Sequence, residues 1–188
     1  MQNLLQKKLK LSYSENVFDI VWFGSSVLEE EKSNDLDIAV IFQKISLKEQ
    51  LKEAQEIKQQ IQKVSDLPVH ISSFDLYSFF DKGNFSKEGI LFYGKSLISG
   101  KSFAERFGFS SKVLIKYSLE KLEKKDKVRF NYLLSGKGGS YGLLRKYGGR
   151  IVSPGVVEVL PEFEKMFFNE MSEISKDLKV EKIFSLKD

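Results

Sequence analysis

Two aspartates are the residues of this chain whose type and spacing most directly suggest chemistry. Asp35 and Asp37 stand two positions apart at the start of an apolar segment. In an extended strand, residues at i and i+2 point to the same face, so the two carboxylates would lie side by side. Neighbouring carboxylates repel each other unless a cation lies between them, and such hard oxygen ligands favour Mg²⁺. The pair is therefore a candidate metal site.

A Gly-Ser-Ser turn precedes this pair, with eight residues between Ser26 and Asp35. Because glycine has no Cβ, the backbone at Gly24 can approach a ligand closely. The N–H groups and hydroxyls of Gly24, Ser25 and Ser26 could then hold phosphate oxygens. Mg²⁺ at the aspartates would bridge the phosphates of a nucleotide and neutralise charge on a transferring phosphoryl group.

Three apolar segments must position these residues. Residues 17–23, 38–42 and 69–74 are rich in β-branched and aromatic types, which predicts buried strands. Ser46, followed three residues later by Glu49, is a capping-box signature and predicts the start of a helix. The predicted apolar face of that helix consists of Leu47, Leu51, Ala54, Ile57, Ile61 and Val64.

These residues resemble the polymerase-β-type nucleotidyltransferase superfamily, and most closely the minimal nucleotidyltransferases of bacteria and archaea. The shared pattern is Gly24-Ser25, a loop, and Asp35-Leu36-Asp37 on a strand, and the order of segments continues to Gly94. The other interpretation, a surface hairpin with two solvated aspartates, is disfavoured by the apolar flanking strands. The resemblance implies an α+β nucleotidyltransferase fold over residues 1–99, a small mixed sheet flanked by helices.

The resemblance also implies an activity, which is Mg²⁺-dependent transfer of a nucleoside monophosphate from an NTP, with ATP expected, to a hydroxyl acceptor. Asp35 and Asp37 would be the catalytic metal ligands, and Gly24, Ser25 and Ser26 would bind the nucleotide. The acceptor, which the sequence leaves open, is a protein hydroxyl, an RNA end or a small molecule. The alternative function is a catalytically weak, nucleotidyltransferase-like protein that serves as a nucleic-acid- or partner-binding module.

The chain departs from the superfamily pattern at the third metal-binding carboxylate, because His70 stands where that residue is expected. Two interpretations remain open. In one, His70 is catalytic, as a metal ligand or as a general base, the commonest role of histidine in catalysis. Otherwise it is a hydrogen-bonded strand residue and the third ligand is missing, in which case the protein would transfer poorly. Asp75, at the far end of the same strand, is another candidate for the third ligand.

Residues 100–188 are expected to form a basic, mainly helical region that begins near Ser99–Lys101. The net charge is −2 over residues 1–100, +9 over 101–150 and −3 over 151–188. Aromatic residues alternate with the cations of the middle stretch, which indicates a surface for nucleic acid or for a triphosphate. The other interpretation is a solvated, lysine-rich helical face with its aromatics in the core. The candidate contacts to nucleic acid or phosphate are Lys137, Arg145, Lys146 and Arg150.

Three helices are predicted in this region from apolar spacing. One begins at Ser110 or Ser111, and its apolar face continues through Phe130, Leu133 and Leu134 until Gly136. A short helix follows over residues 140–147, and residues 141–147 could be the recognition helix of a helix-turn-helix. The last, over residues 161–178, has a wide apolar face that either packs in the core or forms a homodimer or partner interface.

Composition excludes several other classes of site. The chain has no cysteine and a single histidine, so thiolate sites, cysteine nucleophiles and multi-histidine metal sites are ruled out. No apolar run reaches the roughly 20 residues that a membrane span needs, so no membrane association is expected. The lysine-dotted N-terminus lacks the apolar core of a signal peptide, which predicts a cytoplasmic protein.

Overall fold

The chain divides into two compact units, Met1–Gly108 and Phe109–Asp188, each built on a four-stranded sheet. The computed structural model describes residues 10–28, 33–84 and 86–186. The predicted boundary near Ser99–Lys101 lies before this division because the 3₁₀ helix η1 (Phe103–Phe107) packs in the first core, where Phe103 is fully buried. None of the helices in these ranges combines the length and the apolar character required to cross a bilayer.

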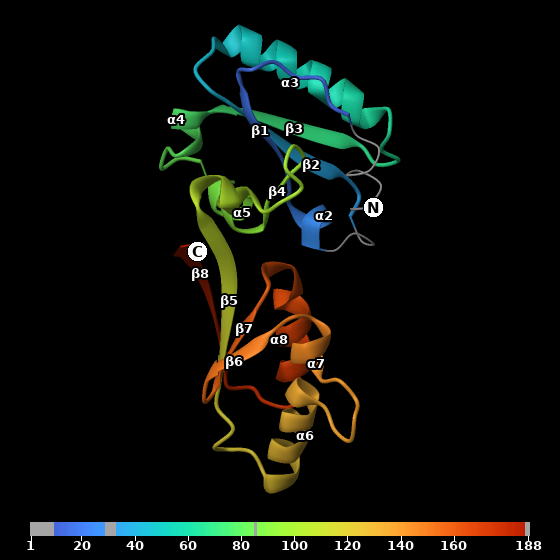
Figure 1. The fold of residues 1–188 in the computed structure, drawn as a ribbon, viewed down its shortest axis with the longest axis vertical. Coiled ribbons are helices and arrows are strands. Elements are labelled where there is room, and N and C mark those ends of the chain that lie inside the picture. Colours follow the sequence, from blue (N-terminus) through green and yellow to red (C-terminus); the bar gives the residue numbers. More distant parts are fainter. Residues whose placement is uncertain (1–9, 29–32, 85, 187–188) are drawn as a thin grey trace. The chain divides into compact units, whose positions relative to one another are not determined.

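The first unit is an α+β structure with a mixed sheet, as predicted. Its strands are β1 (Val17–Phe23), β2 (Leu36–Phe42), β3 (Val69–Asp75) and the short β4 (Lys95–Ser96), in the order β3-β2-β1-β4. β1 runs antiparallel to β2 and to β4, whereas β2 and β3 are parallel. All three strands expected from the apolar segments are therefore confirmed (Figure 1).

Helix α3 (Leu47–Gln62) covers one face of this sheet (Figure 1). It begins with the predicted capping box, in which Ser46 and Glu49 bond each other's backbone N–H groups. Its buried side chains Ala54, Ile57 and Ile61 pack against the apolar residues of β1 and β2. The predicted apolar face is too wide, because Leu47, Leu51 and Val64 are about half exposed or more.

The opposite face is covered by α4 (Leu76–Phe79), α5 (Lys87–Tyr93) and η1. Phe79 and Phe103 are fully buried there and meet edge to face, with their ring centroids 5.8 Å apart. Edge-to-face rings fix the side chains more tightly than apolar contact alone. The sheet therefore has a core on each side, and its functional side chains are confined to its ends.

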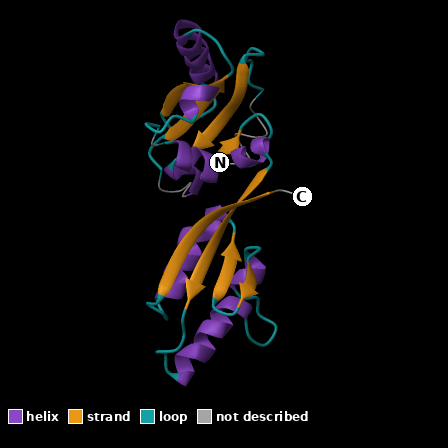
Figure 2. Cartoon of the chain, turned by 90° about the vertical axis from the view of Figure 1, so that its left-hand side faces the viewer, coloured by secondary structure: helices purple, strands orange, loops and turns teal. Residues whose placement is uncertain are grey.

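The second unit is not mainly helical, contrary to the prediction, because its sheet is as extensive as its helices. Its elements are β5 (Phe109–Tyr117), α6 (Lys124–Ser135), α7 (Leu143–Lys146), β6 (Arg150–Ser153), β7 (Val156–Val159), η2 (Pro161–Phe163), α8 (Glu164–Ser172) and β8 (Leu178–Leu186). The sheet order is β6-β7-β5-β8 and all neighbours are antiparallel. This is a split β-α-β arrangement, β-α-β-β-α-β, with its helices on one face (Figure 2).

Each of the three predicted helices of this region is correct only in part. Of the first, only the later residues are helical, as α6. Residues 109–117 form β5, in which Ser111, Val113 and Ile115 are buried in strict alternation with Lys112 and Lys116. That period of two is a strand pattern, which the helical spacing of a few leucines obscured. The last helix stops at Ser172, and its predicted end at residue 178 is instead the start of β8. The short helix α7 has only four residues, too few for a recognition helix.

Candidate metal centre

Strand register brings the predicted metal ligands together at one end of the first sheet. Asp37 pairs with Phe23 of β1 on one side and with His70 of β3 on the other. Paired residues point to the same face, and Asp35, two positions earlier, shares that face. One ligand atom from each of Asp35, Asp37 and His70 lies within 4.8 Å of the others. The structure thus joins residues that are up to 35 positions apart in the sequence.

Gly24 lies directly beside this cluster. Its φ angle is +81°, in the left-handed region that favours glycine. A Cβ at this position would overlap Oδ2 of Asp37. The absence of a side chain at Gly24 is therefore what leaves room for the Asp37 carboxylate, and the turn and the cluster form one site.

Burial and charge act together on Asp37. Burial of its carboxyl raises its pKa, the negative charge of Asp35 raises this pKa further, and His70 lowers it. The His70 Nδ1 atom lies 3.5 Å from Oδ2 of Asp35, and the His70 side chain is 66% exposed. A carboxylate whose charge is disfavoured by a neighbouring carboxylate gains most from a cation.

The donor set fits a divalent cation. Two carboxylates and an imidazole supply three ligands, and solvent or phosphate oxygens can complete the shell. Ligands at about 2.1 Å from one ion lie at most about 4.2 Å apart. The three ligand atoms, which lie within 4.8 Å of one another, are therefore close to the spacing that a shared cation requires.

The two predicted phosphate-binding serines lie in different environments. Ser25 begins the one-turn helix α2 (Ser25–Leu28) and is exposed, with its hydroxyl 3.5 Å from that of Ser33. Ser26 is buried, and its hydroxyl accepts a 2.7 Å hydrogen bond from Nε1 of Trp22. The Ser26 hydroxyl is thus held in the core, which leaves Ser25 as the exposed one of the two serines.

Ser33 is not among the predicted site residues, although its hydrogen bonds support the site. Its hydroxyl donates a 2.7 Å hydrogen bond to the backbone oxygen of Asp35, and it also contacts Ser25. The bond fixes the backbone just before β2, where the first carboxylate projects. A serine two residues before an aspartate is a common turn pattern, and that pattern was the available signal.

Asp75 lies at the far end of β3 from His70. It pairs with Phe42, and its side chain accepts hydrogen bonds from the N–H groups of Tyr77 and Ser78 at the start of α4. These bonds lower the pKa of Asp75, the Ser78 N–H contributing most. Five residue steps along the strand, at about 3.3 Å each, separate it from His70 by roughly 16 Å. Asp75 is a helix cap, out of reach as a third ligand.

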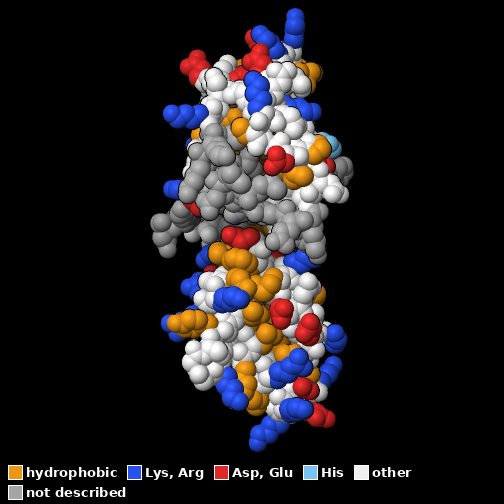
Figure 3. Space-filling model, turned by 90° about the vertical axis from the view of Figure 1, so that its right-hand side faces the viewer, with side chains coloured by type: hydrophobic (Ala, Val, Ile, Leu, Met, Phe, Trp, Pro, Cys, Tyr) orange, Lys and Arg blue, Asp and Glu red, His pale blue; other side chains and the backbone are white. Residues whose placement is uncertain are grey.

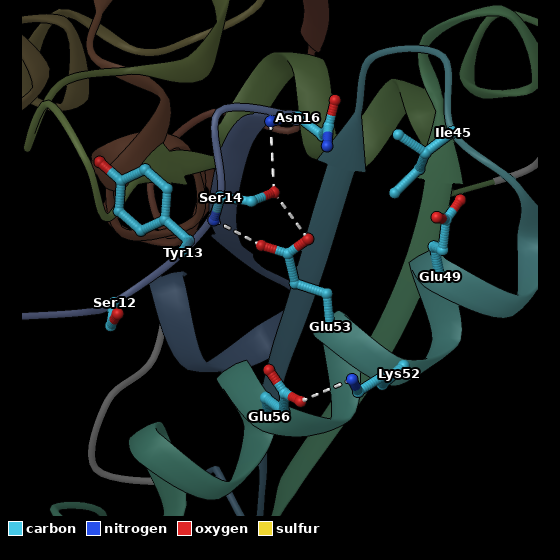
Figure 4. A pocket seen from close by; sticks show the side chains of 9 residues that line it. All are labelled: Ser12, Tyr13, Ser14, Asn16, Ile45, Glu49, Lys52, Glu53 and Glu56. Carbon is cyan, nitrogen blue, oxygen red and sulfur yellow. Dashed lines mark hydrogen bonds and ion pairs between the residues drawn. The ribbon is translucent and has the colours of Figure 1, made fainter.

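A hollow of about 470 Å³ lies at the other end of β1 from Asp37, between residues 12–16 and helix α3 (Figure 4). Its acidic side chains already have partners. Glu53 accepts hydrogen bonds from the N–H and the hydroxyl of Ser14, and Glu56 lies 3.9 Å from Lys52. The hydrogen bonds of Glu53 hold the segment before β1 against α3. The acidic lining of the hollow suits neither phosphate nor nucleotide.

The four basic residues predicted to contact nucleic acid or phosphate all lie in the second unit. Lys137, Arg145 and Lys146 each lie over an aromatic ring, with the charged group 5.1, 4.0 and 5.1 Å from the respective ring centroids. Arg150 instead forms a paired contact with Glu158, its Nε and Nη2 atoms 3.0 and 3.1 Å from the two carboxylate oxygens. Three of the four cations thus lie over aromatic rings, and the fourth is paired with a carboxylate.

The last predicted apolar face, on α8, packs within its own unit. Phe167 and Met171 are fully buried, and Phe167 lies edge-on to Tyr147. Phe168 is 37% exposed. The buried residues of this face therefore belong to the core of the second unit.

Comparisons of the chain with protein-family models, with curated proteins and with solved structures found no match.

Proposed function

We propose that the chain is a metal-dependent nucleotidyltransferase, which moves a nucleoside monophosphate from an NTP to a hydroxyl acceptor. The observation that carries the proposal is the convergence of Asp35, Asp37 and His70 beside a glycine whose missing side chain makes room for one of the carboxylates. A Gly-Ser turn next to paired aspartates on a strand is also the pattern of the nucleotidyltransferase superfamily. The finer assignment of the first unit to that fold is part of this proposal.

In this proposal each residue has a distinct task. Asp35, Asp37 and His70 hold the cation. The exposed Ser25 hydroxyl and the backbone at Gly24 face the triphosphate. Ser33 holds the backbone of Asp35 in place. Bound Mg²⁺ would supply charge neutralisation at the phosphates and a lower pKa for the attacking hydroxyl.

The transfer itself is a substitution at the α-phosphorus. The acceptor hydroxyl oxygen forms a bond to the α-phosphorus, and the bond from that phosphorus to the bridging oxygen of the β-phosphate breaks. Pyrophosphate leaves with the electron pair, and the hydroxyl proton passes to solvent. The protein contributes mainly position and electrostatic stabilisation, because phosphoryl chemistry needs little else.

The test is transfer of label from α-labelled NTPs with Mg²⁺ or Mn²⁺, with and without cell lysate as a source of acceptors. Wild type should label a protein, an RNA or a small molecule, and Asp37→Asn should lower the rate by at least about 100-fold, as loss of a charged group at a reaction centre commonly does. Asp177→Asn removes an exposed carboxylate of the second unit and should leave the rate unchanged. Equal labelling by wild type and Asp37→Asn would overturn the proposal.

A second function is favoured by the character of the third ligand position. His70 is an exposed imidazole where a third carboxylate would hold a second cation, and this weakens activation of the attacking hydroxyl. The protein would then bind nucleotide and act as a binding module. Metal-dependent NTP binding that Asp37→Asn abolishes, without any transfer, would favour this function over the enzyme.

A further inference from the structure

The second unit contains a long stretch without any acidic residue. Between Asp126 and Glu158 lie 31 residues, and the basic ones are Lys127, Arg129, Lys137, Arg145, Lys146 and Arg150. The stretch covers most of α6, the following loop, α7 and the strand β6. On the helix-bearing face of this unit, Lys and Arg side chains lie among hydrophobic ones, and Asp and Glu side chains from outside this stretch are also in view (Figure 3). A local excess of positive charge next to apolar side chains is suited to a polyanion that also has apolar groups.

The loop between α6 and α7 is held in one shape. A Cβ at Gly136 or at Gly142 would overlap backbone atoms, because the two ends of the loop lie against each other. Within the loop, Ser140 donates hydrogen bonds from its N–H and its hydroxyl to the backbone oxygen of Lys137, at 3.1 and 2.6 Å. The side chains at the tip of this loop are therefore presented from a fixed backbone.

Each side of this loop forms a cation–aromatic pair with the neighbouring helix. Lys137 lies over the ring of Tyr132 on α6, and Arg145 of α7 lies over the ring of Tyr141 in the loop. Tyr132 and Tyr141 remain 43% and 63% exposed. Within the described part of the chain, neither Lys137 nor Arg145 forms an ion pair, so their charges are available to an anion.

The open face of the second sheet does not offer the same chemistry. Lys112 and Arg150 both pair with Glu158, and Lys116 lies within hydrogen-bonding distance of Glu181. Each of these cations thus has a carboxylate partner on a neighbouring strand, although Glu158 is shared by Lys112 and Arg150, and Glu181 by Lys116 and Lys179. Lys137 and Arg145, which form no such ion pair among the described residues, lie on the α6–α7 side, beside the exposed tyrosine rings.

We propose that Tyr132, Lys137, Tyr141 and Arg145, which we call the tyrosine–cation surface, bind single-stranded nucleic acid. The exposed rings would stack on unpaired bases, and the two cations would contact the phosphodiester backbone. A duplex keeps its bases stacked on one another and offers the rings nothing to bind. Single strands offer both the phosphates and the open base faces that this surface matches.

The test measures the fluorescence anisotropy of labelled oligonucleotides of about 12 residues, a length within the site size of one small domain. The full chain is titrated, without NTP, into oligo-U RNA, oligo-dT DNA and a duplex of equal length. Wild type should bind one or both single strands more tightly than the duplex, and the RNA and DNA arms identify which nucleic acid is preferred. Tyr141→Ala should weaken single-strand binding by about five- to 100-fold, and Tyr141→Phe, which keeps the ring, should weaken it by less.

Matched controls separate this surface from general positive charge. Arg145→Gln and Arg150→Gln remove the same charge from exposed positions, but only Arg145 belongs to the surface. Arg145→Gln should weaken binding several-fold and reduce the slope of log affinity against log salt by about one, whereas Arg150→Gln should change neither. Tyr77→Ala removes a 79% exposed tyrosine of the first unit and should have no effect.

Three outcomes would overturn the proposal. One is the absence of wild-type binding to either single strand at low salt. Another is an equal loss of binding in Arg145→Gln and Arg150→Gln. The third is displacement by polyphosphate together with unchanged affinity of Tyr141→Ala, which would show recognition of anions alone. Circular dichroism melts of Tyr141→Ala and Arg145→Gln that match wild type would confirm that a lost affinity is not lost folding.

Discussion

The carboxylate of Asp37 lies against the backbone of Gly24, in the space that a side chain at residue 24 would occupy. Gly24 turns away from β1 with a φ of +81°, and the carboxylate of Asp37 fills the position that a Cβ at residue 24 would take. Phe23, the residue before the turn, is the register partner of Asp37. The turn and the carboxylate are therefore adjacent because of strand pairing, and the missing side chain lets them come into contact.

Gly24→Ala should impair this site in two ways, by straining the backbone at residue 24 and by displacing the Asp37 carboxylate. Alanine in the left-handed region costs roughly 1–2 kcal/mol, and its methyl group would displace the Asp37 carboxylate. We expect thermal unfolding several degrees lower and at least tenfold weaker Mn²⁺ binding by calorimetry. Gly89→Ala is the control, because its Cβ would meet nothing within 4 Å and it lies inside α5. That change should stabilise by about 0.5–1 kcal/mol, and a similar fall in both variants would contradict the account.

The site residues of the first unit could be located from sequence because each strand carries its own signal. Apolar runs that stop at Gly24 and start after Asp37 mark strand ends without any knowledge of the partner strand. Their mutual distance could not be derived, because it depends on the parallel register that pairs Asp37 with His70. The different environments of Ser25 and Ser26 likewise depend on Trp22, four residues away from the buried hydroxyl that it bonds.

The second unit shows where local pattern fails. Its strand β5 has Lys112 and Lys116 on one face and Val113 and Ile115 on the other, which is a period of two. The helix prediction, which relied on the spacing of Leu114 and nearby apolar residues, does not take this alternation into account. β8 is the partner of β5 along its whole length. Because antiparallel pairing between segments about 70 residues apart stabilises both strands, the tertiary contact decides the structure, not the intrinsic propensity.

His70 should set the metal preference of the site. An imidazole favours transition metals, whereas a third carboxylate favours Mg²⁺. Mn²⁺ should therefore bind wild type more tightly than Mg²⁺, and His70→Asp should reduce that ratio several-fold by strengthening Mg²⁺ binding. Calorimetric titration of both ions measures the ratio, and His70→Asn controls for the loss of the ring. If the ratio is the same in wild type and His70→Asp, His70 is not a ligand.

Phe167 and Phe168 are neighbours with different environments, which distinguishes a core helix from an interface helix. Phe167 is fully buried, and Phe168 is 37% exposed. Phe167→Ala should lower the free energy of unfolding by about 3–4 kcal/mol because it opens a cavity. Phe168→Ala should lower it by about 1 kcal/mol or less. Denaturant titration measures both, and light scattering shows whether Phe168→Ala changes the mass. A larger loss for Phe168 would place the helix face at an interface instead.

Asp19 is a buried carboxylate away from the metal centre. It is fully buried on β1, accepts a 2.7 Å hydrogen bond from the Ser96 hydroxyl and lies 3.2 Å from Nε of Arg106. Its Oδ2 atom has no hydrogen bond among the described residues, so the ion pair offsets its burial only in part. Burial raises the pKa of Asp19 above its usual 3.8, although Ser96, the Ile20 N–H and Arg106 oppose this.

A raised pKa fixes the sign of a pH effect on stability. The folded state binds the Asp19 proton more tightly than the unfolded state, so this stability is fully present below about pH 3.8 and is lost as pH rises through the folded value. Asp19→Asn replaces the carboxyl group with an uncharged amide of nearly the same shape, so residue 19 no longer makes stability depend on pH. The stability of wild type relative to Asp19→Asn should therefore fall as the pH rises from about 4 to neutrality.

Urea titrations of both proteins at several pH values measure this difference, and Asp177→Asn, an exposed carboxylate, provides the baseline. A difference between wild type and Asp19→Asn that stays constant across the range, or that grows in favour of wild type, would mean that Arg106 and Ser96 stabilise the ionised form fully. Asp19 and Arg106 would then form an ion pair that stabilises the folded state. The expected result instead makes it a carboxylate whose burial costs stability at neutral pH, while Ser96 and Arg106 hold β4 and η1 to β1.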